Sequence, residues 1–157
     1  MTSATLRGPA IESNKVPTEV EDLCLIQDHR FARIRVSIQS ISSELAGPVD
    51  REDRFELAAA ISDVADELRG LQNRKLDIGF FEGFSDTDDH LQERVAHLQS
   101  DYRRLLNELR SAQQETVSGK PRKVCRQLNS WLSHFNSLID READLIAELW
   151  SDSSSAK

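Results

Sequence analysis

Four polar side chains stand where the sequence pattern calls for apolar ones: Gln27, Lys75, Tyr102 and Glu142. Each lies three or four residues from apolar residues of its own segment, which is the spacing of one helix face. These groups serve acid–base chemistry or buried hydrogen-bond networks. A buried carboxylate without a partner is strongly destabilising. We therefore predict that Lys75 pairs with Glu142, and that Tyr102 and Gln27 donate to the same network.

Two alternatives to this buried polar cluster remain open. Lys75 is close to a predicted helix end, so its ammonium can extend to solvent. Glu142 can lie at the edge of its apolar stripe if the helices splay apart. A structural network is favoured over a catalytic one, and we predict no catalytic residue.

The elements that position these residues are four long segments with helical periodicity. We predict helices from Thr18 to about Ala46, from Asp50 to about Leu76, from near Thr87 to near Val117, and from Pro121 to near Trp150. Thr18 and Glu21 form a capping box, and Gly47-Pro48 ends the first helix. Short connections at Gly47 and Gly119 favour an all-α, up-down-up-down antiparallel four-helix bundle.

Apolar residues recur in steps of three and four along each predicted helix, which is the pattern of bundle packing. The expected core comprises Phe31, Ile34, Ile38, Ile41, Leu45, Leu57, Ile61, Val64, Leu68, Leu71, Leu91, Val95, Leu98, Leu105, Leu109, Val124, Leu128, Trp131, Phe135, Leu138, Leu145 and Leu149. Residues 18–151 form the predicted single domain. We expect a disordered arm over 1–17 and a disordered tail over 152–157.

Composition and charge narrow the class of protein. The chain has 157 residues, of which 38% are hydrophobic and 30% charged, with only 4 prolines and 6 glycines. Its net charge of -7 disfavours nucleic-acid binding. Neither a transmembrane run nor a secretory signal is evident.

The two cysteines indicate the redox compartment. We predict no disulfide bond between Cys24 and Cys125, and we therefore expect a cytoplasmic location.

Two further stretches carry candidate binding features. Lys120, Arg122, Lys123 and Arg126 gather at the predicted start of the last helix, where backbone N–H groups attract anions. This candidate anion site would take a phosphate or an acidic partner, and the alternative is a solvated helix end. The apolar stretch "DIGFFEGF" (residues 77–84) is expected to plug one end of the bundle, or else to form a partner surface.

The string "LQNRKLDIGFFEGFSDTDDHLQERVAHLQSDYRRLLNELRSAQQ" resembles the second and third helices of bacterial hemerythrin-like domains. Glu82-Gly83-Phe84 resembles that family's Gly-Gly-aromatic turn, and Asp101-Tyr102 resembles its Glu-His pair. "WLSHFNSLIDREADLIAELWSD" is similar to its last helix. The likeness spans about residues 20 to 152. It implies a four-helix bundle around a non-haem di-iron site that binds or senses oxygen.

The chain departs from this family at the positions of the metal ligands. Histidines are replaced by Lys75 or Arg74 and by Tyr102, and the last His-Glu pair becomes Arg141-Glu142. Its own four histidines have the wrong helical phase to point inward. They are His29, His90, His97 and His134. We therefore predict a degenerate relative with no metal ligands and no cofactor.

These observations favour a non-enzymatic helical bundle that acts through protein contacts or as a regulatory module. One alternative is a genuine hemerythrin-like metal- or oxygen-binding protein. Another is a helical adaptor with an exposed apolar end. Metal analysis of the purified protein separates the first alternative from the preferred interpretation.

Overall fold

The protein folds as a four-helix bundle. The computed structural model describes residues 18–77 and 89–155, with side chains over 27–75 and 89–148. The helices are α2 (Thr18–Leu45), α3 (Arg51–Asp77), α4 (Asp89–Ser118) and α5 (Pro121–Ser155). Within these ranges no strand is present. The predicted fold class is therefore confirmed.

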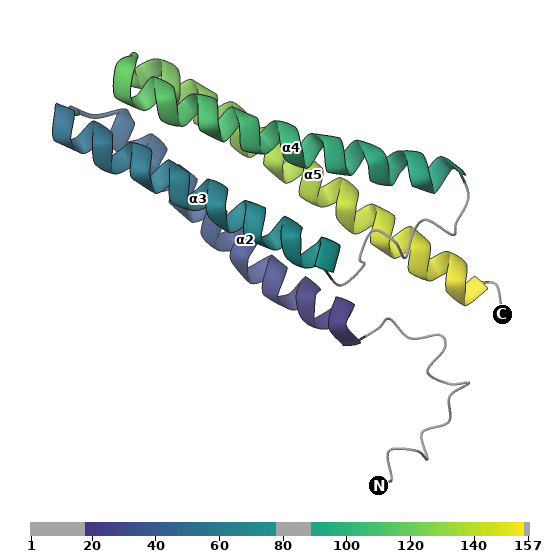
Figure 1. The fold of residues 1–157 in the computed structure, drawn as a ribbon. Helices are drawn as coiled ribbons and strands as arrows, with labels where there is room; N and C mark the ends of the chain where they lie inside the picture. The colour runs from purple at the N-terminus through teal and green to yellow at the C-terminus, as the bar shows by residue number, and fades with distance from the viewer. Residues whose placement is uncertain (1–17, 78–88, 156–157) are drawn as a thin grey trace, which may run out of the picture.

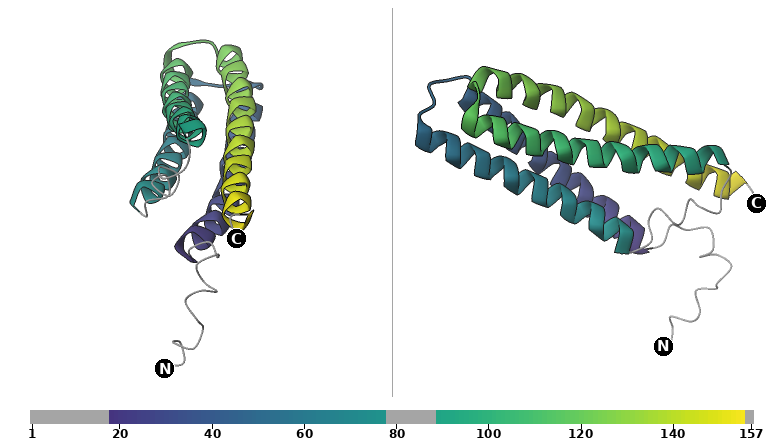
Figure 2. Two further views of the ribbon diagram at one scale, coloured as in Figure 1. Left: turned by 90° about the vertical axis from the view of Figure 1, so that its right-hand side faces the viewer. Right: turned by 45° about the horizontal axis from the view of Figure 1, so that its top comes forward.

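Consecutive helices run antiparallel, and each packs against two neighbours (Figure 1). Helix α3 lies between α2 and α4, and α5 closes the ring by packing on α2. The α2–α3 and α4–α5 connections lie at one end, which we call the loop end (Figure 2). The start of α2 and the finish of α5 lie toward the opposite end, which we call the terminal end.

Local sequence explains the tight connections at the loop end. Asp50 caps α3 as predicted, because its Oδ1 accepts the backbone N–H of Asp53 at 2.8 Å. The Asp53 carboxylate accepts the backbone N–H of Asp50 in return, at 3.3 Å. Arg54 Nη1, in the first turn of α3, donates to the carbonyl oxygen of Gly119 at 2.9 Å and so links the start of α3 to the α4–α5 connection.

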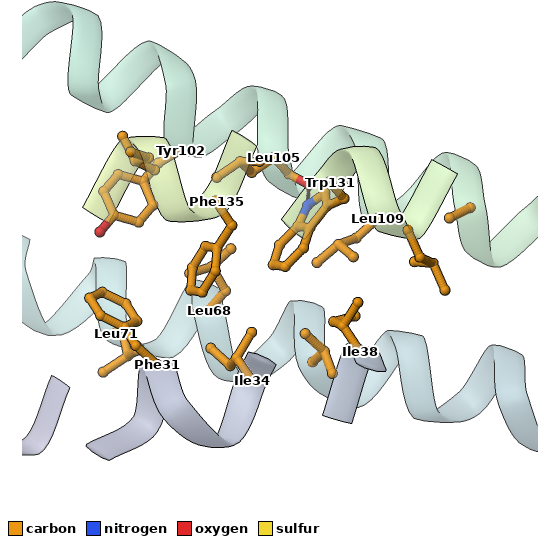
Figure 3. Close-up of a cluster of buried hydrophobic side chains, with 14 of the residues drawn as sticks. Phe31, Ile34, Ile38, Leu68, Leu71, Tyr102, Leu105, Leu109, Trp131 and Phe135 are labelled. Carbon is orange, nitrogen blue, oxygen red and sulfur yellow. Dashed lines mark hydrogen bonds between the residues drawn. The ribbon is translucent and has the colours of Figure 1, made fainter. Parts of the chain in front are cut away.

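The predicted apolar stripes form the core (Figure 3). Every residue of the expected core is buried except Leu149, whose side chain lies outside the described residues. Trp131 stacks on Phe135 at a centroid distance of 4.8 Å, and Phe31 meets Phe135 edge-on at 5.3 Å. The Trp131 indole N–H donates to the Leu105 carbonyl at 2.9 Å, so this buried polar group is satisfied.

One helix boundary differs from the prediction. Helix α5 continues to Ser155 rather than ending near Trp150. The predicted start of α4 near Thr87 lies outside the described residues, which resume at Asp89. No glycine or proline follows Trp150, so nothing in the backbone forces the helix to stop there. The predicted arm over 1–17, residues 78–84 of the apolar stretch and residues 156–157 lie outside the described residues.

Helix hydropathy gives one more result. Across the described ranges, no helix is long and apolar enough to cross a bilayer.

Candidate functional site: a buried polar cluster

The structure brings together the four polar residues singled out in the sequence, one from each helix. Gln27 comes from α2, Lys75 from α3, Tyr102 from α4 and Glu142 from α5. Lys75 Nζ donates to Glu142 Oε2 at 2.7 Å and to the Tyr102 hydroxyl oxygen at 2.7 Å. Gln27 Nε2 donates to Glu142 Oε1 at 2.9 Å. Both carboxylate oxygens of Glu142 therefore accept hydrogen bonds within the core.

The cluster is enclosed by the bundle. Relative exposures are 0% for Lys75, 1% for Tyr102, 2% for Glu142 and 5% for Gln27. The alternative in which Lys75 extends to solvent is therefore wrong, and Glu142 does not lie at a splayed edge. Lys75 stays inside because Glu142 and Tyr102 together replace the hydration of its ammonium.

Aromatic rings complete the surroundings of the ammonium. Lys75 Nζ lies 4.5 Å from the ring centroid of Tyr102 and 5.7 Å from that of Phe31. Both distances are within the range of cation–π attraction, which is strongest where water is absent. The two rings thus add to the stabilisation of the Lys75 charge that its hydrogen bonds provide.

Burial also fixes the protonation state of Tyr102. Desolvation raises the pKa of its hydroxyl well above the ordinary value, and the nearby charge and hydrogen bond of Glu142 raise it further. The hydroxyl therefore keeps its proton. It accepts from Lys75 and donates to Glu142 Oε2 at 3.2 Å, so one side chain bridges the ion pair.

One polar atom of the cluster lacks a partner. Gln27 Oε1 is buried and accepts no hydrogen bond, although the amide nitrogen of the same side chain is bonded to Glu142. Gln27 and Glu142 also line a groove of about 250 Å³ between α2 and α5. The cluster therefore has one edge that borders a cavity.

A di-iron centre does not fit these residues. Iron pairs in helical bundles require several imidazoles and bridging carboxylates that converge in the core. Here the inward donors are one carboxylate, one phenol and one amide, and the Lys75 ammonium would repel a cation. Over the described part of the chain, no group of three or more His, Cys, Asp and Glu side chains is placed to hold a metal ion.

The histidines lie on the surface, as their helical phase predicts. His29, His90, His97 and His134 are all exposed. His90 and His97 line a shallow groove together with Arg94. None of the four side chains points into the core, so none is available to the buried cluster.

The candidate anion site is only partly assembled. Lys123 and Arg126 line a groove of about 380 Å³ between α4 and α5, and this groove also includes Glu108. Lys123 forms an ion pair with Glu115 at 3.2 Å. Lys120 and Arg122 do not line the groove, and both are exposed or half-buried at the loop end.

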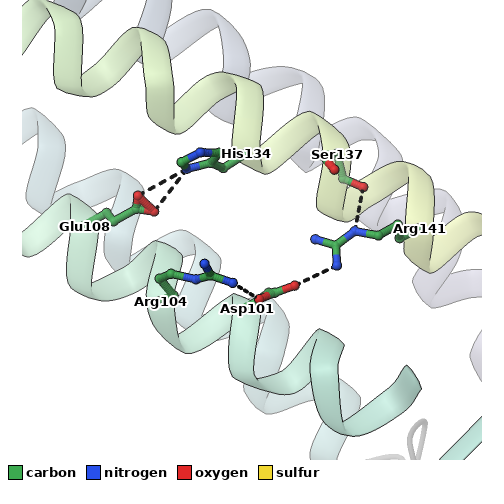
Figure 4. Close-up of polar contacts among 6 residues, drawn as sticks. All are labelled: Asp101, Arg104, Glu108, His134, Ser137 and Arg141. Carbon is green, nitrogen blue, oxygen red and sulfur yellow. Dashed lines mark hydrogen bonds and ion pairs between the residues drawn. The ribbon is translucent and has the colours of Figure 1, made fainter. Parts of the chain in front are cut away.

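A network of charged residues on the surface of α4 and α5 was not predicted from the sequence (Figure 4). Asp101 accepts hydrogen bonds from Arg104 and, at 2.7 Å, from Arg141. Burial alone would raise the pKa of Asp101, but its hydrogen bonds and the charges of Arg141 and Arg104 lower that pKa below the ordinary value. His134 contacts Glu108 at 3.3 Å, two helical turns from the pair of Asp101 and Arg141.

A signal for this network was present in the sequence. Asp101 and Arg141 each directly precede an inward residue of the cluster, Tyr102 and Glu142. Opposite charges at matching positions on neighbouring helices favour an ion pair at that level of the bundle. The Asp101–Arg141 ion pair therefore lies at the same level of the bundle as the buried cluster, on the outer surface of α4 and α5.

Comparisons with known proteins leave the family open. No family model matches the chain, and neither curated proteins nor solved structures give a significant match. The resemblance to hemerythrin-like domains therefore rests on the sequence patterns alone.

Proposed function

We propose that this protein is a non-enzymatic, hemerythrin-like helical bundle without a di-iron site, which acts through contacts with other proteins. The observation that carries the proposal is the ion pair between Lys75 and Glu142, 2.7 Å apart in the core. It stands where the family resemblance implies metal ligands. A cytoplasmic location is part of the same proposal, and the free thiol of Cys125 is compatible with a reducing compartment.

The enclosed state of the cluster supports a structural role for it. Among the side chains that the structure describes, Lys75, Tyr102 and Glu142 are the buried groups with acid–base chemistry, and their polar atoms are bonded to one another. General acid–base catalysis needs such a group within hydrogen-bond reach of a substrate. The Lys75 ammonium is instead committed to partners inside the protein.

The loop end supports an interaction role. Phe55, in the first turns of α3, is 50% exposed, and Val117, in the last turn of α4, is 41% exposed. The bond from Arg54 to Gly119 places these two helix ends side by side. Lys120 directly precedes α5 and Arg122 lies in its first turn, at the same end. Apolar side chains beside basic ones suit an acidic protein segment with a few apolar anchors.

Iron analysis tests the first half of the proposal. Protein purified after expression in iron-supplemented medium should contain far less than one iron per chain, and its visible spectrum should lack a charge-transfer band. An iron pair in every chain would overturn the proposal and favour a metal- or oxygen-binding protein.

Affinity capture with matched variants tests the second half. The combined change Phe55→Ser and Arg122→Glu should abolish recovery of a partner that the wild-type chain captures, because it removes an apolar anchor and reverses a charge. The control is Val36→Ser with Arg103→Glu, since both of these residues are exposed on other faces. Equal recovery with the two variants would contradict an interaction through the loop end.

A further inference from the structure

The first half of α5 is basic, although the chain as a whole is acidic. Residues 116–139 contain no Asp or Glu, in a protein with 27 acidic and 20 basic residues. The same stretch contains four basic residues, Lys120, Arg122, Lys123 and Arg126. Cations at the start of a helix are unfavourable beside the positive end of its dipole. Helix stability therefore does not account for these side chains, whereas an anionic partner would.

The charges of two of these arginines are not neutralised by the protein itself. Lys123 pairs with Glu115 of α4 at 3.2 Å. Arg122 and Arg126 are both exposed, and neither forms an ion pair or a hydrogen bond with any residue that the structure describes. Arg126 and Lys123 line the groove of about 380 Å³ between α4 and α5. The two guanidinium groups are therefore accessible to a partner.

Helix α2 adds a further cation beside α5, on which it packs. Arg35 Nε donates to Asn136 Oδ1 at 2.7 Å, and its guanidinium lies 5.9 Å from the ring centroid of Phe135. These contacts hold its charge against α5. Residues 29–43 of α2 also contain no Asp or Glu. Arg35, Arg122, Lys123 and Arg126 together form what we call the basic face.

The length of the basic face limits the kind of polyanion that fits it. The distance along α5 from Arg122 to Asn136, the residue that Arg35 contacts, is about 21 Å. Asp140 follows in α5, and Asp28 lies beyond Arg35 in α2. A long nucleic-acid duplex would extend over these carboxylates and be repelled. A short anionic segment would not reach them.

The spacing of the cations matches an extended polypeptide. Arg122 and Arg126 are four residues apart in α5, which places them about 6 Å apart along the helix axis. In an extended chain, every second side chain points to the same side, at intervals of about 7 Å. Seven extended residues span about 23 Å, which is close to the length of the basic face.

From these observations we infer that the basic face binds an extended acidic segment of a partner protein, with a carboxylate at every second residue. The inference rests on the protein-interaction role proposed above and names where the acidic residues of the partner lie. Its apolar anchors would contact the loop end, and its carboxylates would pair with Arg122, Arg126 and Arg35. Electrostatic complementarity of this kind gives specificity and fast association.

The probe for this surface is an octapeptide of alternating glutamate and serine, added to the full chain at about 50 mM salt and followed by amide chemical shifts. Shifts that saturate should be confined to residues 33–40 and 120–136, with a dissociation constant on the order of 0.1 mM. Binding should weaken at about 200 mM salt, because salt screens exposed charges. The matching peptide of lysine and serine should not bind, and a duplex of about 24 base pairs should bind more weakly than the glutamate peptide.

Variants of equal charge change separate the basic face from overall electrostatics. Arg126→Glu combined with Arg35→Gln should weaken binding of the glutamate peptide at least about tenfold. Arg103→Glu combined with Arg69→Gln changes the net charge equally at exposed positions of α4 and α3, and should alter the affinity less than about twofold. Arg126→Glu alone, at an exposed position, keeps the test valid if Arg35→Gln disturbs packing.

Phe55→Ser distinguishes this inference from the loop-end contact. It should leave peptide binding unchanged, because the probe has no apolar side chain. If the loop-end variant fails to affect partner capture while the peptide still binds, only the loop-end contact is overturned.

Three results would overturn the inference itself. They are the absence of saturable shifts along the basic face, equal loss of affinity in the two double variants, and tighter binding of the duplex than of the glutamate peptide. The second would mean that only overall charge matters, and the third would assign the face to nucleic acid.

Discussion

Lys75 and Glu142 show how a charged pair is accommodated in an apolar core. Moving either charge out of water alone is very unfavourable, and the attraction between the two offsets this only when the geometry is good and the remaining polar atoms are bonded. Here Gln27 bonds the second carboxylate oxygen and Tyr102 bridges the pair. The pair therefore contributes more to defining one arrangement of the helices than to net stability.

This account predicts strong coupling between the two charges. Lys75→Met and Glu142→Leu should each lower the free energy of unfolding by about 3–5 kcal/mol, because each leaves one buried charge unpaired. The double variant should lie within about 1 kcal/mol of the wild type, since apolar side chains of similar volume replace both charges. Urea denaturation of the four proteins measures the coupling.

The exposed pair of Arg69 and Asp66, 3.1 Å apart, provides the control. Arg69→Met and Asp66→Ala should each change stability by less than about 1 kcal/mol, because water already hydrates both groups. If the effects of the two buried substitutions simply add, the charges are not paired in solution.

The sequence predicted which residues of the cluster face inward and that Lys75 pairs with Glu142, but not the full pattern of their hydrogen bonds. Helical phase places Gln27, Lys75, Tyr102 and Glu142 in their apolar stripes, and desolvation demands a partner for the carboxylate. Helical phase alone does not reveal that the Tyr102 hydroxyl accepts a hydrogen bond from Lys75 and donates one to Glu142. The groove between α2 and α5 could not be predicted either. It depends on how the side chains of these two helices pack near Gln27 and Glu142, which are 115 residues apart in the sequence.

At the scale of the helices, periodicity predicted the elements well and their ends less well. Gly47-Pro48 and Asp50 give strong stop and start signals, and the α2–α3 connection lies there. Beyond Trp150 the sequence offers serine and aspartate, which have weak helix propensity but do not forbid a further turn. Helix α5 therefore runs to Ser155.

Helix α3 contains one residue that weakens it without an evident role in packing. Gly70 lies inside the helix, and a Cβ atom built there would meet no atom within 4 Å. Gly70→Ala should therefore raise the free energy of unfolding by about 0.5–1 kcal/mol, by restricting the unfolded chain and favouring the helix. Thermal and urea denaturation measure the gain.

Gly119→Ala is the contrasting variant. A Cβ atom at Gly119 would approach the Glu115 carboxylate, which is paired with Lys123. That side chain would have to move and lose its ion pair, so we expect no gain in stability. A loss of stability in Gly70→Ala would mean that the surface of α3 is covered by a partner at that position.

At the scale of the molecule, the two ends of the bundle are held together by different means. The loop end has two short connections, and the bond from Arg54 to Gly119 joins the start of α3 to the α4–α5 connection. Farther along, Trp131, Phe135 and Phe31 pack the middle. Toward the terminal end, the buried cluster is the feature that joins all four helices through side-chain hydrogen bonds. Loss of the cluster should therefore loosen one part of the bundle more than the other.

Hydrogen exchange tests this difference between the two ends. In Lys75→Met, amides near the cluster, at residues 27–31, 98–102 and 138–142, should exchange about a hundredfold faster under native conditions, which corresponds to about 3 kcal/mol of local opening. Amides near the loop end, at residues 38–45 and 57–64, should change much less, because their apolar contacts remain. The Lys75→Met, Glu142→Leu double variant should restore protection near the cluster. Equal acceleration at both ends would mean that the bundle opens only as a whole, and the cluster would then stabilise the entire fold rather than its own end.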